Sequence, residues 1–94
     1  MIEPSLFSPT WTVRFEGHEL EILCRPIIGA TGGNQAFLHD LTGRLHRAAL
    51  DITDDELLRV VRYAAYNDGR GGYQERFRTI LRAARRAGWR EVQP

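Results

Sequence analysis

The stretch Thr53-Asp54-Asp55-Glu56 marks the start of a helix more clearly than any other segment of this chain. Its threonine hydroxyl can accept a hydrogen bond from the backbone N–H of Glu56, while the Glu56 carboxylate reaches back to the N–H of Thr53. The two aspartates place negative charge at the positive end of the helix dipole. Apolar residues then recur at helical spacing, namely Leu57, Val61 and Ala64, with Leu58 and Ala65 beside them. We therefore predict a helix over about 54–66 that buries this face.

Another helix is predicted at the C-terminal end of the chain. Asn67-Asp68-Gly69 supplies residues that tolerate the left-handed cap at the end of 54–66. Gly71-Gly72 then precedes a run with apolar residues at three- and four-residue spacings: Tyr73, Phe77, Ile80, Leu81 and Ala84. Gly88 follows this run, so we predict a helix over about 73–87 whose apolar stripe packs on the core.

Upstream, the same periodicity predicts a helix over about 34–48, with the stripe Phe37, Leu38, Leu41, Leu45 and Ala48. Gly43 lies inside this segment and weakens a helix by ~1 kcal/mol relative to alanine, so an early end or a bend there is the alternative. A Gly-Gly-x-Gln pattern occurs at the start of both this helix and the last one. It indicates either two glycine-rich helix starts or a duplicated unit, because two short matches do not establish a repeat.

Before residue 26 the period is two. Trp11, Val13 and Phe15 alternate with polar residues, Gly17-His18 supplies a turn, and a second alternating run covers 19–24. Pro26 removes a donor and ends regular pairing near Arg25. We predict a β-hairpin over 11–25 in which Cys24 faces the core. Its two edges are either shielded by helices and the N-terminal arm or paired with another chain, as in a homodimer through a hairpin edge.

These elements predict an α+β fold of order ββααα in one compact domain over 11–90, with an extended arm at 1–10 and a tail at 91–94. A chain of 94 residues is long enough for one core. Cys24 is the single cysteine, which excludes an internal disulfide framework. We expect no membrane association because no apolar run spans a bilayer, and a cytoplasmic location because the N-terminus does not resemble a secretory signal.

All thirteen basic side chains are arginine, and seven of them fall between Arg70 and Arg90. Residues 1–40 carry five acids against Arg14 and Arg25, so a chain of formal charge +1 is strongly polarised. A GC-rich genome explains the missing lysines equally well. Either way, the guanidinium group offers a rigid fork of donors that suits desolvated contacts with carboxylates or phosphates.

The last predicted helix carries a stripe of arginines opposite its apolar face: Arg78, Arg82, Arg85 and Arg86. Two interpretations stay open for this stripe. It is a solvated helix face, partly neutralised by acids such as Glu19, Asp54 or Asp55, or it is a docking surface for an acidic protein patch or a phosphate backbone. For the docking surface, Arg78 and Arg82 are the preferred contacts.

Other candidates lie in the same half of the chain. Arg70, before Gly71-Gly72, precedes a helix N-terminus where an anion can bind, although turn geometry also explains this segment and no phosphate-loop motif follows. Tyr73 and Trp89 add the aromatic residue types that are frequent at binding hot spots. The predicted partner-binding set is therefore Arg70, Arg78, Arg82, Arg85, Arg86, Tyr73 and Trp89.

Residues that carry catalysis or metal chemistry are few. His39 and His46 are seven apart, about 10 Å along a continuous helix, and cannot share one metal ion. His18 falls in the predicted hairpin turn, and no nucleophile-and-base pattern is recognisable. We predict no catalytic residue, no metal site and no cofactor. If the protein were an enzyme, His39 and the Arg70 loop would be its best sites.

The sequence thus favours a small non-enzymatic regulator or inhibitor that docks an arginine and aromatic surface on an acidic protein partner. Compact regulators of this kind are often carried by phages and plasmids, and nucleic-acid-handling machinery is one target that we consider. The alternative is a nucleic-acid-binding protein that uses the arginine-rich C-terminal helix. A pI of 8.0 and the acidic cluster at 54–56 argue against this alternative.

Overall fold

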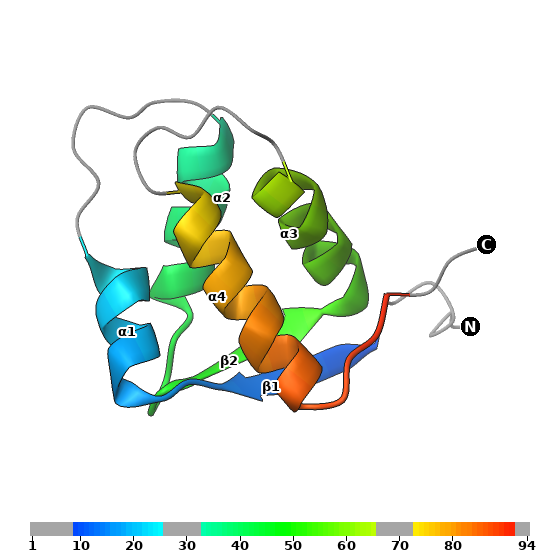
Figure 1. Ribbon diagram of the computed structural model, residues 1–94, viewed down its shortest axis with the longest axis horizontal. Coiled ribbons are helices and arrows are strands. Elements are labelled where there is room, and N and C mark those ends of the chain that lie inside the picture. Colours follow the sequence, from blue (N-terminus) through cyan, green and yellow to red (C-terminus); the bar gives the residue numbers. More distant parts are fainter. Residues whose placement is uncertain (1–8, 26–32, 66–72, 92–94) are drawn as a thin grey trace, which may run out of the picture.

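The computed structural model describes residues 9–25, 33–65 and 73–91. In chain order these residues form β1 (Thr10–Arg14), α1 (Gly17–Cys24), α2 (Gly33–Gly43), β2 (Ala49–Thr53), α3 (Asp54–Ala65) and α4 (Tyr73–Arg86). The α+β class is confirmed, but the described residues hold four helices, and the order differs from ββααα. Figure 1 shows the two-stranded ribbon at the bottom of the molecule with α2, α3 and α4 above it.

The predicted hairpin over 11–25 is wrong in its second half, because residues 17–24 form α1 instead of a strand. The Glu19 carboxylate accepts a hydrogen bond from the backbone N–H of Glu16 at 2.8 Å, which caps the start of the helix. Glu19 and Leu23, four residues apart, are the buried residues of α1. The period of two at 19–24 is therefore coincidental, and burial at helical spacing determines the local structure.

The strand that pairs with β1 comes from 35 or more residues further along the chain. β2 lies antiparallel to β1, with Trp11 opposite Ile52 and Val13 opposite Leu50. On the inner face of the ribbon Val13, Leu50 and Ile52 are completely buried or nearly so. On the outer face the Thr12 hydroxyl donates a hydrogen bond to the Asp51 carboxylate opposite it, at 2.7 Å.

The helix predicted over 34–48 ends at Gly43, the early end that its glycine favours. Beyond it the chain makes a tight turn in which His46 and Ala49 exchange both backbone hydrogen bonds, at 2.8 and 3.0 Å. The two central residues, Arg47 and Ala48, have φ of 53° and 64°. Positive φ at both central positions is the geometry of a type I′ turn. This turn leads directly into β2.

The segment from Thr53 to Ala65 forms as its sequence predicts. Thr53 and Glu56 form the capping box. The backbone nitrogen of Thr53 lies 3.0 Å from the Glu56 carboxylate that accepts its hydrogen bond, and the backbone nitrogen of Glu56 lies 3.1 Å from the Thr53 hydroxyl oxygen. The buried face of α3 consists of Leu57, Val60 and Ala64. Val60 thus occupies the place expected for Val61, which is half-buried.

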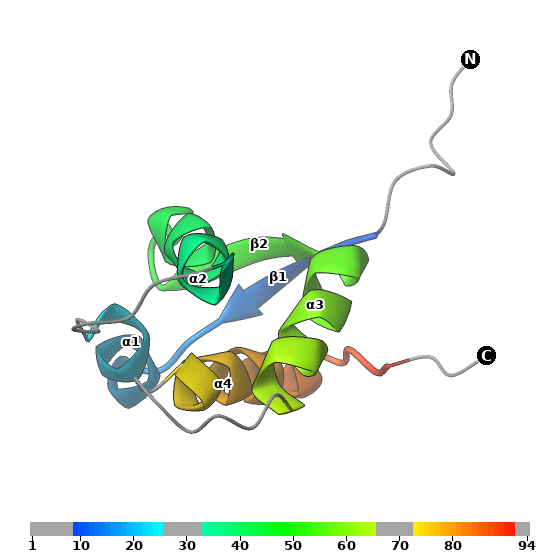
Figure 2. The same cartoon turned by 90° about the horizontal axis from the view of Figure 1, so that it is seen from above.

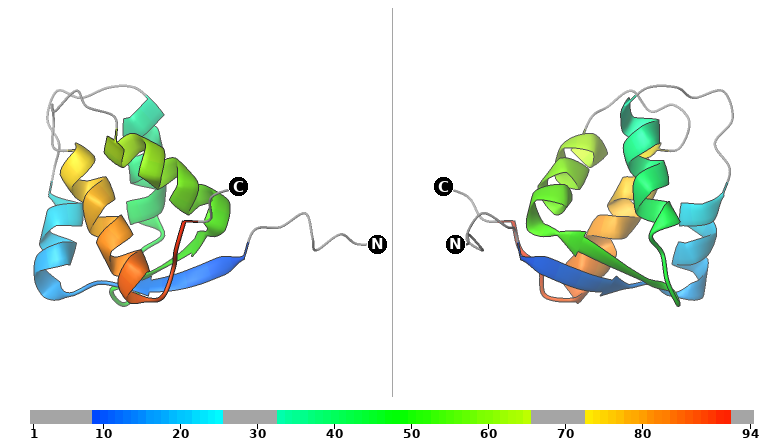
Figure 3. Two further views of the ribbon diagram at one scale, coloured as in Figure 1. Left: turned by 45° about the vertical axis from the view of Figure 1, so that its right-hand side comes forward. Right: turned by 180° about the vertical axis from the view of Figure 1, so that it is seen from behind.

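Helices α3 and α4 pack antiparallel to each other. At one end the Gln74 side chain donates to the carbonyl of Ala64 at 3.4 Å. At the other end the Trp89 indole N–H donates to the Asp54 carboxylate at 2.7 Å. Viewed from behind, α4 is visible between α3 and α2, with the ribbon below (Figure 3).

The core lies between the ribbon and the helices. Phe37, Tyr63 and Phe77 meet there with ring centroids 5.4–6.0 Å apart. The guanidinium of Arg59 lies over the Phe37 ring at 3.9 Å from its centroid, a cation–π contact. Because α2, α3 and α4 each supply one ring, this cluster determines how the three helices sit against one another.

Side chains cover parts of both ribbon edges. On β2 the guanidinium of Arg44 reaches the Asp51 carbonyl at 3.4 Å, and Glu56 accepts the N–H of Thr53. On β1 the guanidinium of Arg86 donates to the Arg14 carbonyl at 2.9 Å. Such contacts reduce the tendency of an edge to pair with another chain. A homodimer through a strand edge stays a prediction, and it would now have to use β1 or β2 instead of a hairpin.

None of the helices in the described segments combines the length and the apolar character that crossing a membrane requires.

Candidate functional site

The four arginines of the predicted stripe on α4 fall into two groups. Arg78, Arg82 and Arg85 are exposed on the side of the helix opposite Phe77 and Ala84. These three residues are called the arginine face below. Figure 1 shows α4 at the front of the molecule, and Figure 2, seen from above, shows it as the outermost element on that side. Since α4 contacts α3, α1, α2 and β1 with its other sides, the arginine face points to solvent.

Arg86, the fourth arginine of the stripe, is directed toward α1 instead. Its guanidinium donates to both carboxylate oxygens of Glu19, at 2.8 and 3.2 Å. The Glu19 side chain is only 1% exposed, while that of Arg86 is 43% exposed. The hydrogen bond from Arg86 lowers the pKa of Glu19 below its ordinary value, and that bond raises the pKa of Arg86. Arg86 is thus engaged within the chain, and we leave it out of the candidate surface.

The three residues of the arginine face have no such partner among the described residues. None of them takes part in an ion pair or a side-chain hydrogen bond there, and the nearby acid of the same helix, Glu75, pairs with Arg25 at 3.9 Å. Arg14, Arg47 and Arg62 are likewise exposed, but they come from three separate segments. The distinctive feature of Arg78, Arg82 and Arg85 is therefore their common position on one helix face.

A shallow hollow lies between these arginines. It has a volume of about 250 Å³ and is lined by Arg78, Leu81, Arg82 and Arg85. Leu81 is 6% exposed and belongs to the core cluster, so an apolar residue takes part in this charged surface. The methylene stems of arginine side chains cover apolar surface while their guanidinium groups stay in water. The arrangement can hold an apolar group and bind anionic groups around it.

Of the other predicted contact residues, the structure places only Trp89, and it does not join this surface. Trp89 is 1% exposed and is tied to Asp54 through its indole N–H, so it belongs to the core. Arg70 lies outside the described residues, as does the proposed anion site at Arg70-Gly71-Gly72. Tyr73 begins α4, but the orientation of its side chain is not described.

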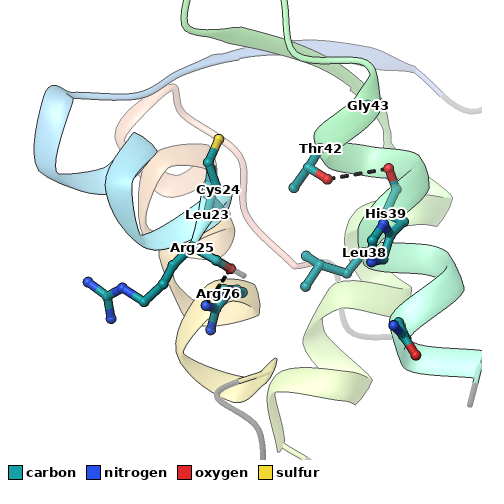
Figure 4. A pocket seen from close by; sticks show the side chains of 9 residues that line it. Leu23, Cys24, Arg25, Leu38, His39, Thr42, Gly43 and Arg76 are labelled. Atoms are coloured by element: carbon teal, nitrogen blue, oxygen red, sulfur yellow. Dashed lines mark hydrogen bonds between the residues drawn. The ribbon is translucent and has the colours of Figure 1, made fainter. Parts of the chain in front are cut away.

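A larger hollow, of about 490 Å³, lies between the end of α1, α2 and α4. Figure 4 shows Cys24 and Arg25 on the α1 side of it and Leu38, His39 and Thr42 on the α2 side. Arg76, from α4, is 3% exposed and donates to the Arg25 carbonyl at 2.8 Å. Among the described residues, those that line this hollow include no carboxylate.

This second hollow was not predicted from the sequence, because Cys24 was expected on a strand, facing the core. Cys24 in fact ends α1 and is exposed. To predict this hollow from the sequence, residues 17–24 must first be assigned as a helix, because Cys24 and Arg25 face α2 only at the end of that helix. The reactive residue types present, a thiol and the imidazole of His39, come from two different walls of the hollow.

The remaining histidines, His18 and His46, are exposed and lie away from this hollow. His18 lies in the first turn of α1, where its ring nitrogen is 3.7 Å from the Glu16 carboxylate. His46 is in the turn before β2, outside the helix that carries His39. Across 9–25, 33–65 and 73–91, the side chains of His, Cys, Asp and Glu form no group of three able to hold a metal ion.

Comparisons with protein-family models, with curated proteins and with solved structures find no match to this chain. Function therefore has to be inferred from the side chains themselves.

Proposed function

We propose that this protein is a small non-enzymatic regulator or inhibitor that docks its arginine face on an acidic surface of a partner protein. The observation that carries this proposal is the contrast among the charges of α4. Arg86 is paired with Glu19, and Glu75 is paired with Arg25. Arg78, Arg82 and Arg85 share one exposed face and have no acidic partner in the described part of the chain.

The physical argument rests on the cost of leaving like charges together. Three cations within two helical turns repel one another, which opposes folding unless anions neutralise them. An acidic partner supplies this neutralisation in the complex. Arginine is suited to such contacts because its planar fork binds a carboxylate through two parallel hydrogen bonds. It is also one of the residue types that contribute most to the binding energy of protein interfaces.

The alternative partner is nucleic acid, bound through phosphate contacts of the same helix. Three exposed arginines neutralise only a few phosphates, and the formal charge of the whole chain is +1. The acidic N-terminus of α3, residues 54–56, lies beside the C-terminal end of α4, as the bond between Asp54 and Trp89 shows. That negative charge opposes a long polyanion, which extends over both regions, more than it opposes a short acidic patch confined to the arginine face, so we favour the protein partner. The partner itself can still belong to nucleic-acid-handling machinery.

The test is an affinity capture with the full chain as bait and mass spectrometry of the proteins retained. Two variants accompany the wild type: Arg78→Glu with Arg82→Glu, and Arg47→Glu as the matched charge reversal outside α4. We expect an acidic protein that the wild type and Arg47→Glu retain and that the double variant loses. Retention of the same proteins by all three baits overturns the proposal. Binding of duplex DNA that falls steeply with added salt, without a retained protein, supports the alternative.

A further inference from the structure

The hollow on α4 has the geometry of a helix-packing hole. Among the described residues, four line it: Arg78, Leu81, Arg82 and Arg85, which stand at positions i, i+3, i+4 and i+7 of one helix. In coiled coils, a hole formed by four neighbouring residues of one helix receives one side chain, the knob, from a facing helix. The hollow therefore has the shape that a partner helix would fill.

The chemistry of the hole indicates what kind of knob it accepts. Leu81 and the methylene stems of three arginines offer apolar contact, which suits a branched aliphatic side chain. The hollow is open to solvent and has a volume of about 250 Å³, so a side chain of a facing helix can enter it. The guanidinium groups surround the hole, so acidic residues are favoured next to the knob.

The spacing of the cations matches the same kind of partner. Along the helix axis Arg82 lies about 6 Å from Arg78, and Arg85 lies about 10 Å from Arg78. Carboxylates one and two turns apart on a second helix have the same spacing. An extended acidic segment rises more than twice as far per residue and does not keep one side chain over the hole and carboxylates over each arginine.

Building on the proposed function, we propose that the partner presents an acidic amphipathic α-helix that lies along the exposed side of α4. One apolar side chain of this helix enters the hole over Leu81, and its neighbouring Asp or Glu residues pair with Arg78, Arg82 and Arg85. No other described element covers this side of α4 (Figures 1 and 2), so a helix can approach it along its length.

Synthetic peptides of about 20 residues test this proposal, each held helical by a side-chain staple because isolated helices are marginal in water. The first peptide carries one Leu knob flanked by Glu residues at helical spacing. The second replaces the knob by Ala. The third keeps the knob and the Glu residues of the first but has one other central residue replaced by proline and carries no staple. Binding of each peptide, and of a short DNA duplex, to the wild type, Arg82→Glu and Arg47→Glu is measured by fluorescence anisotropy.

We expect the Leu-knob peptide to bind about tenfold more tightly than the Ala-knob peptide, the difference for burying a leucine. The proline peptide should lose binding, Arg82→Glu should weaken binding about tenfold, and Arg47→Glu should leave it unchanged. Equal binding of all three peptides, with sensitivity to Arg82→Glu, overturns the helix proposal but leaves acidic docking intact. Binding of none of the peptides also overturns it, and the affinity capture then decides the proposed function separately. Binding of DNA alone overturns both.

Discussion

The carboxylate of Glu19 in α1 accepts two hydrogen bonds from the guanidinium of Arg86, 67 residues later at the end of α4. The same guanidinium also holds the Arg14 carbonyl at the edge of β1. One arginine thereby joins three elements, α1, β1 and α4. This contact gives Arg86 a structural role and distinguishes it from the three residues of the arginine face.

Replacement of Arg86 is expected to destabilise the protein more than replacement of any arginine of the arginine face. Arg86→Met leaves the Glu19 carboxylate, which is 1% exposed, without its cationic partner. The double variant with Glu19→Gln removes this uncompensated charge and should recover part of the stability. Thermal unfolding of the two variants, with Arg85→Met as the matched control, measures the effect. Equal midpoints for Arg86→Met and Arg85→Met contradict the structural role of Arg86.

Stability should fall when the pH is lowered below the ordinary carboxyl pKa. The hydrogen bond from Arg86 makes the pKa of Glu19 lower in the folded than in the unfolded state, where it is near 4.5. Its contribution to stability is therefore fully present above that value and is lost as the pH falls through the lower, folded-state pKa. Melting temperatures recorded from neutral pH down to about pH 3 should decline less steeply at the acid end for Glu19→Gln than for the wild type. Parallel curves would show that Glu19 does not contribute.

Charge reversal on the arginine face should leave the fold intact. Arg78 and Arg82 have no ion pair in the described part of the chain, so Arg78→Glu with Arg82→Glu should change the free energy of unfolding by no more than about 0.5 kcal/mol per site. Denaturant unfolding checks this value. A collapse of stability in this variant would mean that the two arginines hold the fold together, and the docking proposal would fail.

Two substitutions at positive φ should have opposite effects. Ala48 has φ of 64°, so Ala48→Gly relieves strain and should stabilise the protein by about 1 kcal/mol. Gly88 has φ of 107°, so Gly88→Ala should destabilise it by about 1 kcal/mol or more. Among the described residues the added methyl group itself meets only the Trp11 ring, at 3.9 Å, so backbone strain is the dominant effect. Thermal unfolding of both variants gives the sign of each change in stability. The same sign for both would contradict the positive φ at these two positions.

Local sequence predicted the elements whose signals lie within a few residues of one another. The capping box of Thr53 and Glu56, the end of α2 at Gly43 and the apolar stripe of α4 all depend on neighbours within one or two turns. The period of two at 11–15 also marked β1 correctly. The same signal was wrong at 19–24, where Leu20 and Ile22 alternate with acids but lie on a helix.

For the candidate site, too, local spacing predicted one part and the tertiary structure decided the other. Helical spacing alone placed Arg78, Arg82 and Arg85 together, because the 3.6-residue period determines which side chains share a face. The pairing of β1 with β2, the helical state of 17–24 and the engagement of Arg86 by Glu19 became apparent only in the tertiary structure. The strand pairing and the Arg86–Glu19 contact join residues more than 30 positions apart, and no local pattern encodes which distant segment will bury a given side chain. The helical state of 17–24 has a local cap, but the burial of Glu19 and Leu23 that accompanies it comes from the tertiary structure.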